Sequence, residues 1–199
     1  KPNLNILSTK IQEDFDLKDL LIETGVNGLY LMPGGQEEKW LSKNYNERNY
    51  FKSLSLSILN AYSNFEFDVV LIDLGAGNSK YTIDLFLLAH TGVVVSLPES
   101  TSLENSYAFI KSIFWGIISN IGFQLEMPEK AKQVLEFLFP NRRDTGSFIP
   151  LRKKLIEQAE IYPDFIEAIF KALSVRDLGI VINQTRTFKD IDLSKSMST

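Results

Sequence analysis

The sequence contains no cysteine and a single histidine, His90, among its 199 residues. Disulfides, thiolate metal sites, a cysteine nucleophile and histidine-based metal clusters are therefore excluded. A net charge of -4 with 23% charged residues gives no overall attraction to nucleic acid or to anionic lipid. The most apolar stretch, residues 107–123, contains Lys111 and other polar residues, whereas a bilayer span needs about 20 mostly apolar residues. These absences favour an ordinary soluble, intracellular protein.

The printed sequence begins with Lys1 rather than methionine, and no charged-then-apolar leader follows it. We therefore expect it to be a piece of a longer chain. A length of 199 residues fits one α/β domain, or one domain that carries an insertion.

The most informative stretch is residues 67–77, which read Phe-Asp-Val-Val-Leu-Ile-Asp-Leu-Gly-Ala-Gly. The four consecutive apolar residues 69–72 are typical of a strand that is buried on both faces of a parallel sheet. Asp73 ends this run, and Gly75 and Gly77 follow in a loop whose backbone a phosphate can approach closely. The sequence therefore predicts a central strand whose carboxyl end is a ligand-binding edge.

Hydrophobic spacing and turn residues predict the remaining elements. The predicted helices cover residues 16–24, 47–63, 81–90, 102–120, 131–139, 151–160 and 164–173, and the other predicted strands cover residues 28–33, 92–97 and 177–183. Thr101 with Glu104 is interpreted as a capping box that opens the long helix.

Strand, helix and strand over residues 67–97 predict a βαβ unit with parallel strands and a right-handed crossover. We therefore predict a three-layer α/β fold with a mainly parallel sheet. The block at about residues 124–175, which has no strand signal, is interpreted as an all-helical insertion within one domain, residues 1–199.

Candidate functional groups gather at the ends of four predicted strands, at residues 32–34, at residues 73–77, at Pro98 and Glu99, and at Asn183. If the strands are parallel, these residues meet at one sheet edge. A single carboxylate there can hold a hydrated magnesium ion, and backbone amides of the glycine loop can donate to a phosphate. The alternative is that Asp73 caps a turn and that the glycines only form it.

Two known motifs compete for the glycine loop. Gly75-x-Gly77 resembles the start of a dinucleotide fingerprint, but Lys80 stands where the third glycine belongs. The Leu-Gly-Ala-Gly sequence after an acidic residue resembles the first motif of adenosylmethionine-dependent methyltransferases, with Glu99 as a candidate ribose-binding acid. Ser79 replaces a glycine that those enzymes usually carry.

The flanking sequence favours a third interpretation. The stretches that carry it are, in chain order, Pro-Asn-Leu at residues 2–4, Asn-Gly-Leu-Tyr-Leu-Met-Pro-Gly at 27–34, the stretch at 67–77 that ends in Asp-Leu-Gly-Ala-Gly, Phe-Leu-Leu-Ala at 86–89, Val-Val-Val at 93–95, Pro-Glu-Ser-Thr-Ser-Leu-Glu-Asn at 98–105 and Val-Ile-Asn-Gln-Thr-Arg at 181–186. In this order they resemble the MinD/ParA group of P-loop ATPases, which belongs to the CobQ/CobB/MinD/ParA family, and most of all its MinD-like and flagellar-number-regulator branch. The similarity runs nearly end to end, apart from the helical block.

The resemblance implies an incomplete P-loop NTPase-like fold with ATP and Mg as cofactors. Asp73 would be the catalytic Walker B acid that holds magnesium through water. Gly77 would be the switch amide near the γ-phosphate, with Gly75 in the same loop. The parent activity would be ATP hydrolysis coupled to dimerisation, in intracellular positioning, partitioning or flagellar regulation.

The same resemblance implies that Asn183 reads the adenine edge and that Pro98 and Glu99 lie near the nucleotide or the partner subunit. It also implies a homodimer in the bacterial cytoplasm, peripheral at the membrane in the intact protein. A helical insertion beside the nucleotide edge is expected either to bind a protein partner or to cover one sheet face.

The basic residues around the Gly-containing loop are interpreted as a solvated cluster, so this chain does not support membrane or DNA contact. They are Arg142, Arg143, Arg152, Lys153 and Lys154.

One part of the family pattern is missing from the printed sequence. The deviant Walker A loop is expected upstream of Lys1, and no Gly-Lys-Ser or Gly-Lys-Thr occurs in the 199 residues. That loop supplies the amide cradle and the lysine for the phosphates, and the hydroxyl on magnesium. We therefore expect weak ATP affinity and negligible hydrolysis. Either the chain is a fragment, or it is a degenerate member that acts as a non-catalytic interaction scaffold.

Overall fold

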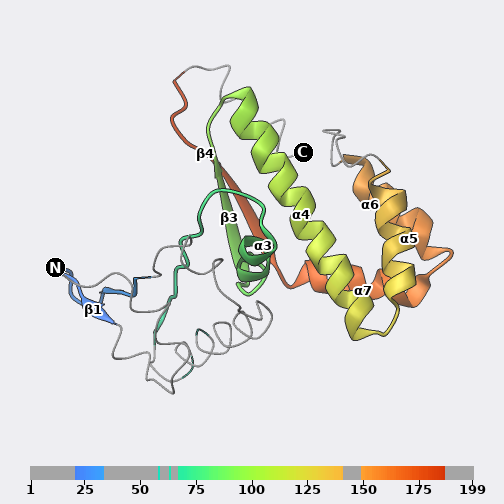
Figure 1. Cartoon of the computed structure of the whole chain (residues 1–199), viewed down its shortest axis with the longest axis horizontal. Helices are drawn as coiled ribbons and strands as arrows, with labels where there is room; N and C mark the ends of the chain where they lie inside the picture. Colours follow the sequence, from blue (N-terminus) through green and yellow to red (C-terminus); the bar gives the residue numbers. More distant parts are fainter. Residues whose placement is uncertain (1–20, 34–57, 59–62, 64–66, 141–148, 187–199) are drawn as a thin grey trace, which may run out of the picture. The chain divides into compact units, whose positions relative to one another are not determined.

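A computed structural model of the chain describes residues 21–33, 58, 63, 67–140 and 149–186 (Figure 1). The chain divides into two compact units, Lys1–Asp73 and Leu74–Thr199. Within the described residues, no helix combines the length and the hydrophobicity that a membrane span requires.

The described part of the first unit contains a small antiparallel hairpin. Strand β1 (Ile22–Glu23) pairs with β2 (Tyr30–Leu31). The turn between them suits its sequence, because Gly28 has φ 77° and the Thr24 hydroxyl donates to the Leu29 carbonyl over 2.8 Å. The ring centroid of Tyr30 lies 6.0 Å from that of Phe67.

The hairpin tests two predictions. The predicted strand over residues 28–33 is confirmed for β2. The predicted helix over residues 16–24 is wrong at β1, because the turn closed by Thr24 directs that segment into strand pairing. Residues 16–20 lie outside the described residues. Of the predicted helix over 47–63, only residues 58 and 63 are described, and both are helical.

The predicted central strand at residues 69–72 is wrong. Residues 67–79 lie outside helices and strands. The side chains of Val69 and Leu71 are 69% and 90% exposed, rather than buried on both faces. An apolar run can form a strand only where a neighbouring strand accepts its backbone hydrogen bonds, and no described strand pairs with this segment. The βαβ unit predicted over residues 67–97 is therefore not formed.

The second unit contains five helices and a parallel strand pair within its described residues. They are α3 (Lys80–Phe86), β3 (Thr91–Ser96), α4 (Ser100–Gln124), α5 (Pro128–Leu138), α6 (Ile149–Ala159), α7 (Pro163–Ser174) and β4 (Asp177–Ile182). Strands β3 and β4 are parallel, in a register that runs from Thr91 opposite Asp177 to Ser96 opposite Ile182. The four helices α4 to α7 connect them. Mixed helices with a small parallel sheet are compatible with the α/β class.

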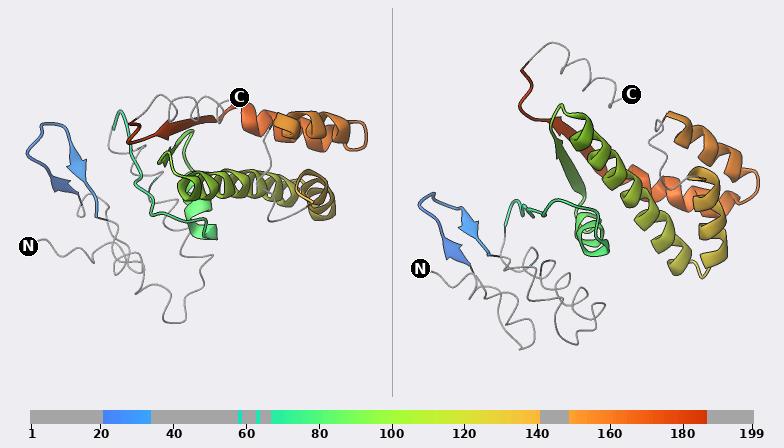
Figure 2. Two further views of the ribbon diagram at one scale, coloured as in Figure 1. Left: turned by 90° about the horizontal axis from the view of Figure 1, so that it is seen from above. Right: turned by 45° about the horizontal axis from the view of Figure 1, so that its top comes forward.

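Two helices cover one face of this sheet. Burial alternates along β3, so that Gly92, Val94 and Ser96 are buried while Val93 and Val95 are exposed. A Cβ added at Gly92 would lie 2.1 Å from the ring of Phe86, so α3 packs directly on the strand. Figure 2 shows α3 and α4 on the same side of the β3 and β4 pair. The buried side chains of β3 therefore face these two helices.

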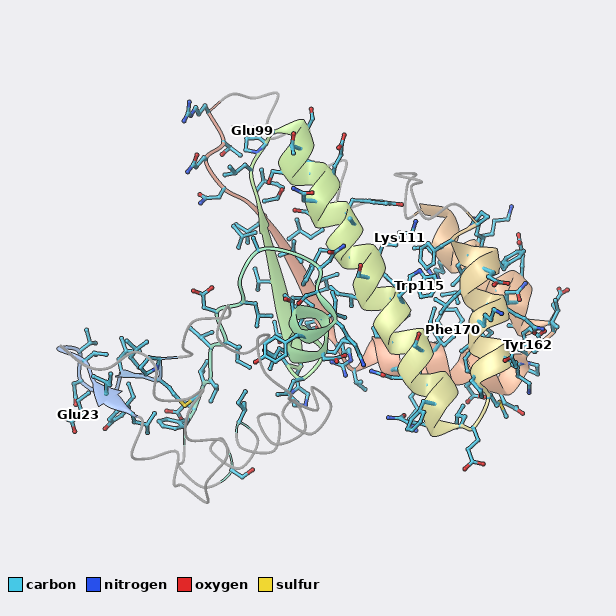
Figure 3. The ribbon with its side chains drawn as sticks, viewed as in Figure 1. Glu23, Glu99, Lys111, Trp115, Tyr162 and Phe170 are labelled. Atoms are coloured by element: carbon cyan, nitrogen blue, oxygen red, sulfur yellow. The ribbon has the colours of Figure 1, made fainter. Side chains whose placement is uncertain are left out.

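Helices α4 to α7 share a hydrophobic core. Its least exposed side chains include Ile118, Val134, Phe165 and Ile169, each at most 1% exposed. Burying side chains of this size stabilises the fold by about 1.5–3 kcal/mol each. Figure 3 shows Trp115 on the side of α4 that faces the other three helices, and its partly buried side chain packs against this core.

Prolines set two of these helix boundaries. Pro128 and Pro163 stand in the first turns of α5 and α7, where the missing N–H costs no helical hydrogen bond. The predicted helices over 131–139, 151–160 and 164–173 are confirmed to within a few residues.

The capping box predicted for the long helix is wrong. Glu99 is the N-cap residue of α4, and its side chain makes no capping hydrogen bond. Thr101 already lies in the first turn, so its hydroxyl stands past the position from which a cap reaches the free amides. Figure 3 places Glu99 at the start of α4, next to the end of β3.

Candidate functional site

The carboxyl ends of β3 and β4 form one edge of the parallel sheet. The backbone N–H of Asn183, directly after β4, donates to the carbonyl of Ser96 over 2.8 Å. Because Pro98 and Glu99 follow β3 by two and three residues, the structure brings the Pro-Glu turn and Asn183 to the same edge. This is the arrangement expected of parallel strands.

Serine hydroxyls fix the turn that carries Pro98. The Ser96 and Ser102 hydroxyl oxygens lie 3.0 Å apart, and the Ser102 oxygen accepts the Leu97 N–H over 2.9 Å. The Ser106 hydroxyl donates back to the Ser102 carbonyl over 2.9 Å. Because Ser96 is only 2% exposed, this bridge joins the end of the strand to the first turn of α4 in a buried setting.

Sequence reasoning missed this serine bridge. The alternation of buried and exposed residues along β3 could have indicated it. Ser96 lies two residues after the buried Val94 and is therefore on the same, buried face, where its hydroxyl needs a hydrogen-bond partner.

The side chain of Asn183 is also held locally. Its Oδ1 accepts the N–H of Gln184 over 2.8 Å, and Gln184 has φ 58°. An asparagine that receives the next backbone amide, followed by a left-handed residue, forms a tight turn at the end of the strand. The chain therefore turns away from the sheet directly after Asn183.

The glycine loop leads directly into α3. Gly77 has φ 122°, a conformation that favours glycine, and an added Cβ would meet no atom within 4 Å. Ser79 then caps α3, since its Oγ accepts the Thr82 N–H over 3.1 Å. Gly75 and Gly77 are exposed and share one open loop, whereas the exposed Asp73 belongs to the first unit.

The donor side chains of the described residues bear on which metal they could hold. No group of three or more histidine, cysteine, aspartate or glutamate side chains gathers within the described residues. Mg²⁺ takes as few as one or two carboxylates when phosphates and water complete its octahedron. A single carboxylate such as that of Asp73 is therefore sufficient for a magnesium ion that arrives with a phosphate ligand.

No family model, curated protein or solved structure matches the chain. The resemblance to the MinD/ParA group therefore stays a prediction from the motifs.

Three charged residues lie in or beside α3: Lys80 and Asp84 belong to the helix, and Arg176 contacts the residues at its carboxyl end. Burial raises the pKa of Asp84 above its ordinary value of 3.8, and the positive charge of Lys80 partly offsets that effect. At the other end of the helix, Arg176 Nη1 donates to the carbonyls of Leu87 over 2.6 Å and Ala89 over 2.9 Å. Nothing in the sequence pattern indicates this contact, because it spans almost ninety positions.

Proposed function

We propose that the chain is part of a MinD/ParA-like nucleotide-binding domain, with the three-layer P-loop NTPase-like fold that this implies. One observation supports the proposal most. The Pro-Glu turn and Asn183, which the resemblance assigns to the nucleotide side, lie together at the carboxyl edge of a parallel sheet. That edge is where open α/β sheets bind their ligands.

In this proposal Asp73 holds magnesium through water, and the amides at Gly75 and Gly77 face the γ-phosphate. Asn183 reads the adenine edge, because its side-chain nitrogen can donate and its Oδ1, which accepts the Gln184 N–H, keeps a second lone pair. Pro98 and Glu99 line the nucleotide or the face of a second subunit. ATP-dependent dimerisation in intracellular positioning, partitioning or flagellar regulation would be the activity of the intact protein.

Hydrolysis by this chain is expected to be negligible, because the printed sequence contains no Gly-Lys-Ser or Gly-Lys-Thr to hold the β and γ phosphates. A steady-state phosphate-release assay measures this directly. A turnover rate typical of intact ATPases, abolished by Asp73→Ala, would contradict the expectation.

Two other functions remain as alternatives. The first is an adenosylmethionine-dependent methyltransferase-like domain, supported by the Leu-Gly-Ala-Gly motif and the position of Glu99 at the end of β3. The second is a non-catalytic interaction scaffold, supported by the large helical share of the second unit.

Thermal shift separates the three. The chain is heated alone, with Mg·ATP, with ADP and with adenosylmethionine, and each condition is repeated on Asp73→Asn, which keeps the size of the side chain and removes its charge. A ligand at one hundred times its Kd stabilises a fold by about 2.7 kcal/mol. The proposal predicts a rise with Mg·ATP that shrinks in the variant and without magnesium. A rise with adenosylmethionine alone favours the methyltransferase, and no rise with any ligand favours the scaffold.

A further inference from the structure

The contact between Arg176 and α3 has a consequence for motion. We infer that Arg176 couples two parts of the second unit. The first is α3 with the glycine loop that precedes it, and the second is the connection between α7 and β4. A conformational change in one part is therefore transmitted to the other.

The first support is the way in which α3 is held. The helix has only seven residues, and it starts from a loop in which Gly77 adopts φ 122° with open space around it. An isolated helix of this length has little stability of its own in water. Its position therefore depends on the contacts that it makes.

Those contacts lie on one side and at one end. Ile83 and Leu87 pack over Gly116 of α4, where an added Cβ would lie 2.8 Å from Leu87, and Phe86 packs over Gly92 of β3. At the end of the helix, the carbonyls of Leu87 and Ala89 both accept from Arg176. The guanidinium thus donates to the C-cap residue Leu87 and to Ala89, which follows the helix.

The second support is where Arg176 stands in the chain. It is the second residue after α7 and directly precedes β4. Its own N–H donates to the Leu173 carbonyl over 3.3 Å, and the next amide, that of Asp177, donates to the His90 carbonyl over 2.9 Å. Arg176 therefore contacts the carboxyl ends of α3 and α7, and it directly precedes Asp177, whose amide bonds to the residue before β3.

The amino end of α3 therefore follows an open glycine loop, whereas its carboxyl end is held by the hydrogen bonds from Arg176. A displacement of the glycine loop moves α3. Because the residues at the carboxyl end of α3 are hydrogen-bonded to Arg176, this movement also acts on the connection between α7 and β4. The coupling follows from these contacts alone and holds whether or not the loop binds a phosphate.

The test is a double-variant cycle read by amide hydrogen exchange on the full chain. Ser79→Ala removes the N-cap of α3, and Ser79→Asp, which keeps a capping oxygen, is its matched control. Each is made in the native chain and in the Arg176→Ala background. Cap removal is expected to raise the opening of α3 about twofold to thirtyfold.

In the native chain, Ser79→Ala is expected to speed exchange at Asp177 as well as within α3, while Ser79→Asp leaves Asp177 unchanged. In the Arg176→Ala background, Ser79→Ala is expected to change α3 alone. If Arg176→Ala does not fold, the cycle is run with Arg176→Lys, which retains donors and charge and is expected to weaken the response at Asp177.

Two results would overturn the inference. One is a response at Asp177 that is equally large with and without the guanidinium. The other is an equal change at Asp177 and at the core amides of Val134 and Leu135, which would mean that Ser79→Ala lowers global stability and that Arg176 is only a structural contact.

Discussion

Replacing Gly122 by alanine is expected to destabilise the helical core, although alanine is the better helix former. Gly122 is buried in α4, and a Cβ added there would lie 2.4 Å from the Cβ of Ala131 in α5. Carbon atoms in contact normally stay about 3.5–4.0 Å apart, so relieving the 2.4 Å approach would require the two helices to separate by roughly 1.1–1.6 Å. Ala131 cannot rotate out of the way, because its Cβ is bonded directly to the backbone.

The magnitude follows from two opposing effects. Overpacking a core lowers the free energy of unfolding by about 1–3 kcal/mol, and the higher helix propensity of alanine raises it by about 1 kcal/mol. We therefore expect a net loss of about 0–2 kcal/mol in the free energy of unfolding. For a chain of this size a loss of 1 kcal/mol lowers Tm by about 2–4 °C.

Urea unfolding of Gly122→Ala, Ala131→Gly and the double variant measures the effect and isolates its cause. The double variant exchanges the two residues, so that one methyl group again fills the space between α4 and α5. It is expected to be more stable than the sum of the single changes predicts. A gain of about 1 kcal/mol for Gly122→Ala alone, with additive single changes, would refute the close contact and leave propensity as the only effect.

Two further predictions concern a titration and a backbone conformation. Burial raises the pKa of Asp84, so its ionised form is disfavoured by folding. Asp84→Asn should therefore raise Tm near pH 7. This gain should vanish as the pH falls below 3.8, because the carboxyl is then protonated in both the folded and the unfolded state. A gain in Tm that grows toward acid pH would contradict this reasoning. Glu126, between α4 and α5, has φ 57°, which costs a non-glycine residue about 1–2 kcal/mol. Glu126→Gly should raise the urea midpoint, while Glu126→Ala, which keeps the strain, should not; equal effects of the two variants would refute the reasoning.

The helices of the second unit could be predicted from the sequence because each carries its own signal. Apolar residues recur at helical spacing, and Pro128 and Pro163 mark two helix starts. The strands β3 and β4 were also predictable, as short apolar runs that end at turn residues. In each case the local sequence signals the element, and β3 and β4 also need each other as pairing partners.

Features that depend on a distant partner could not be predicted. The apolar residues 69–72 fit a buried strand, but the sequence does not say which strand would pair with them, and in the structure they are unpaired with any described strand. The direct pairing of β3 with β4 across four helices, and the bonds from Arg176 to α3, likewise join segments that are far apart in the chain.

The candidate site was predictable in part. That Pro98, Glu99 and Asn183 share an edge follows from parallel strands, and the structure has this arrangement. The serine bridge from Ser96 to Ser102 was not foreseen, because hydroxyl pairing depends on how α4 leaves the strand. The roles assigned to the glycine loop and Asp73 stay predictions.

Titration of the isotope-labelled chain with Mg·ATP, followed by amide chemical shifts, tests the central claim most directly. The account predicts saturable shifts at Gly75, Gly77 and Asn183, with weak affinity, and a loss of their magnesium dependence in Asp73→Asn. Unchanged shifts at all three positions with millimolar Mg·ATP, or shifts that are the same in Asp73→Asn, would contradict it.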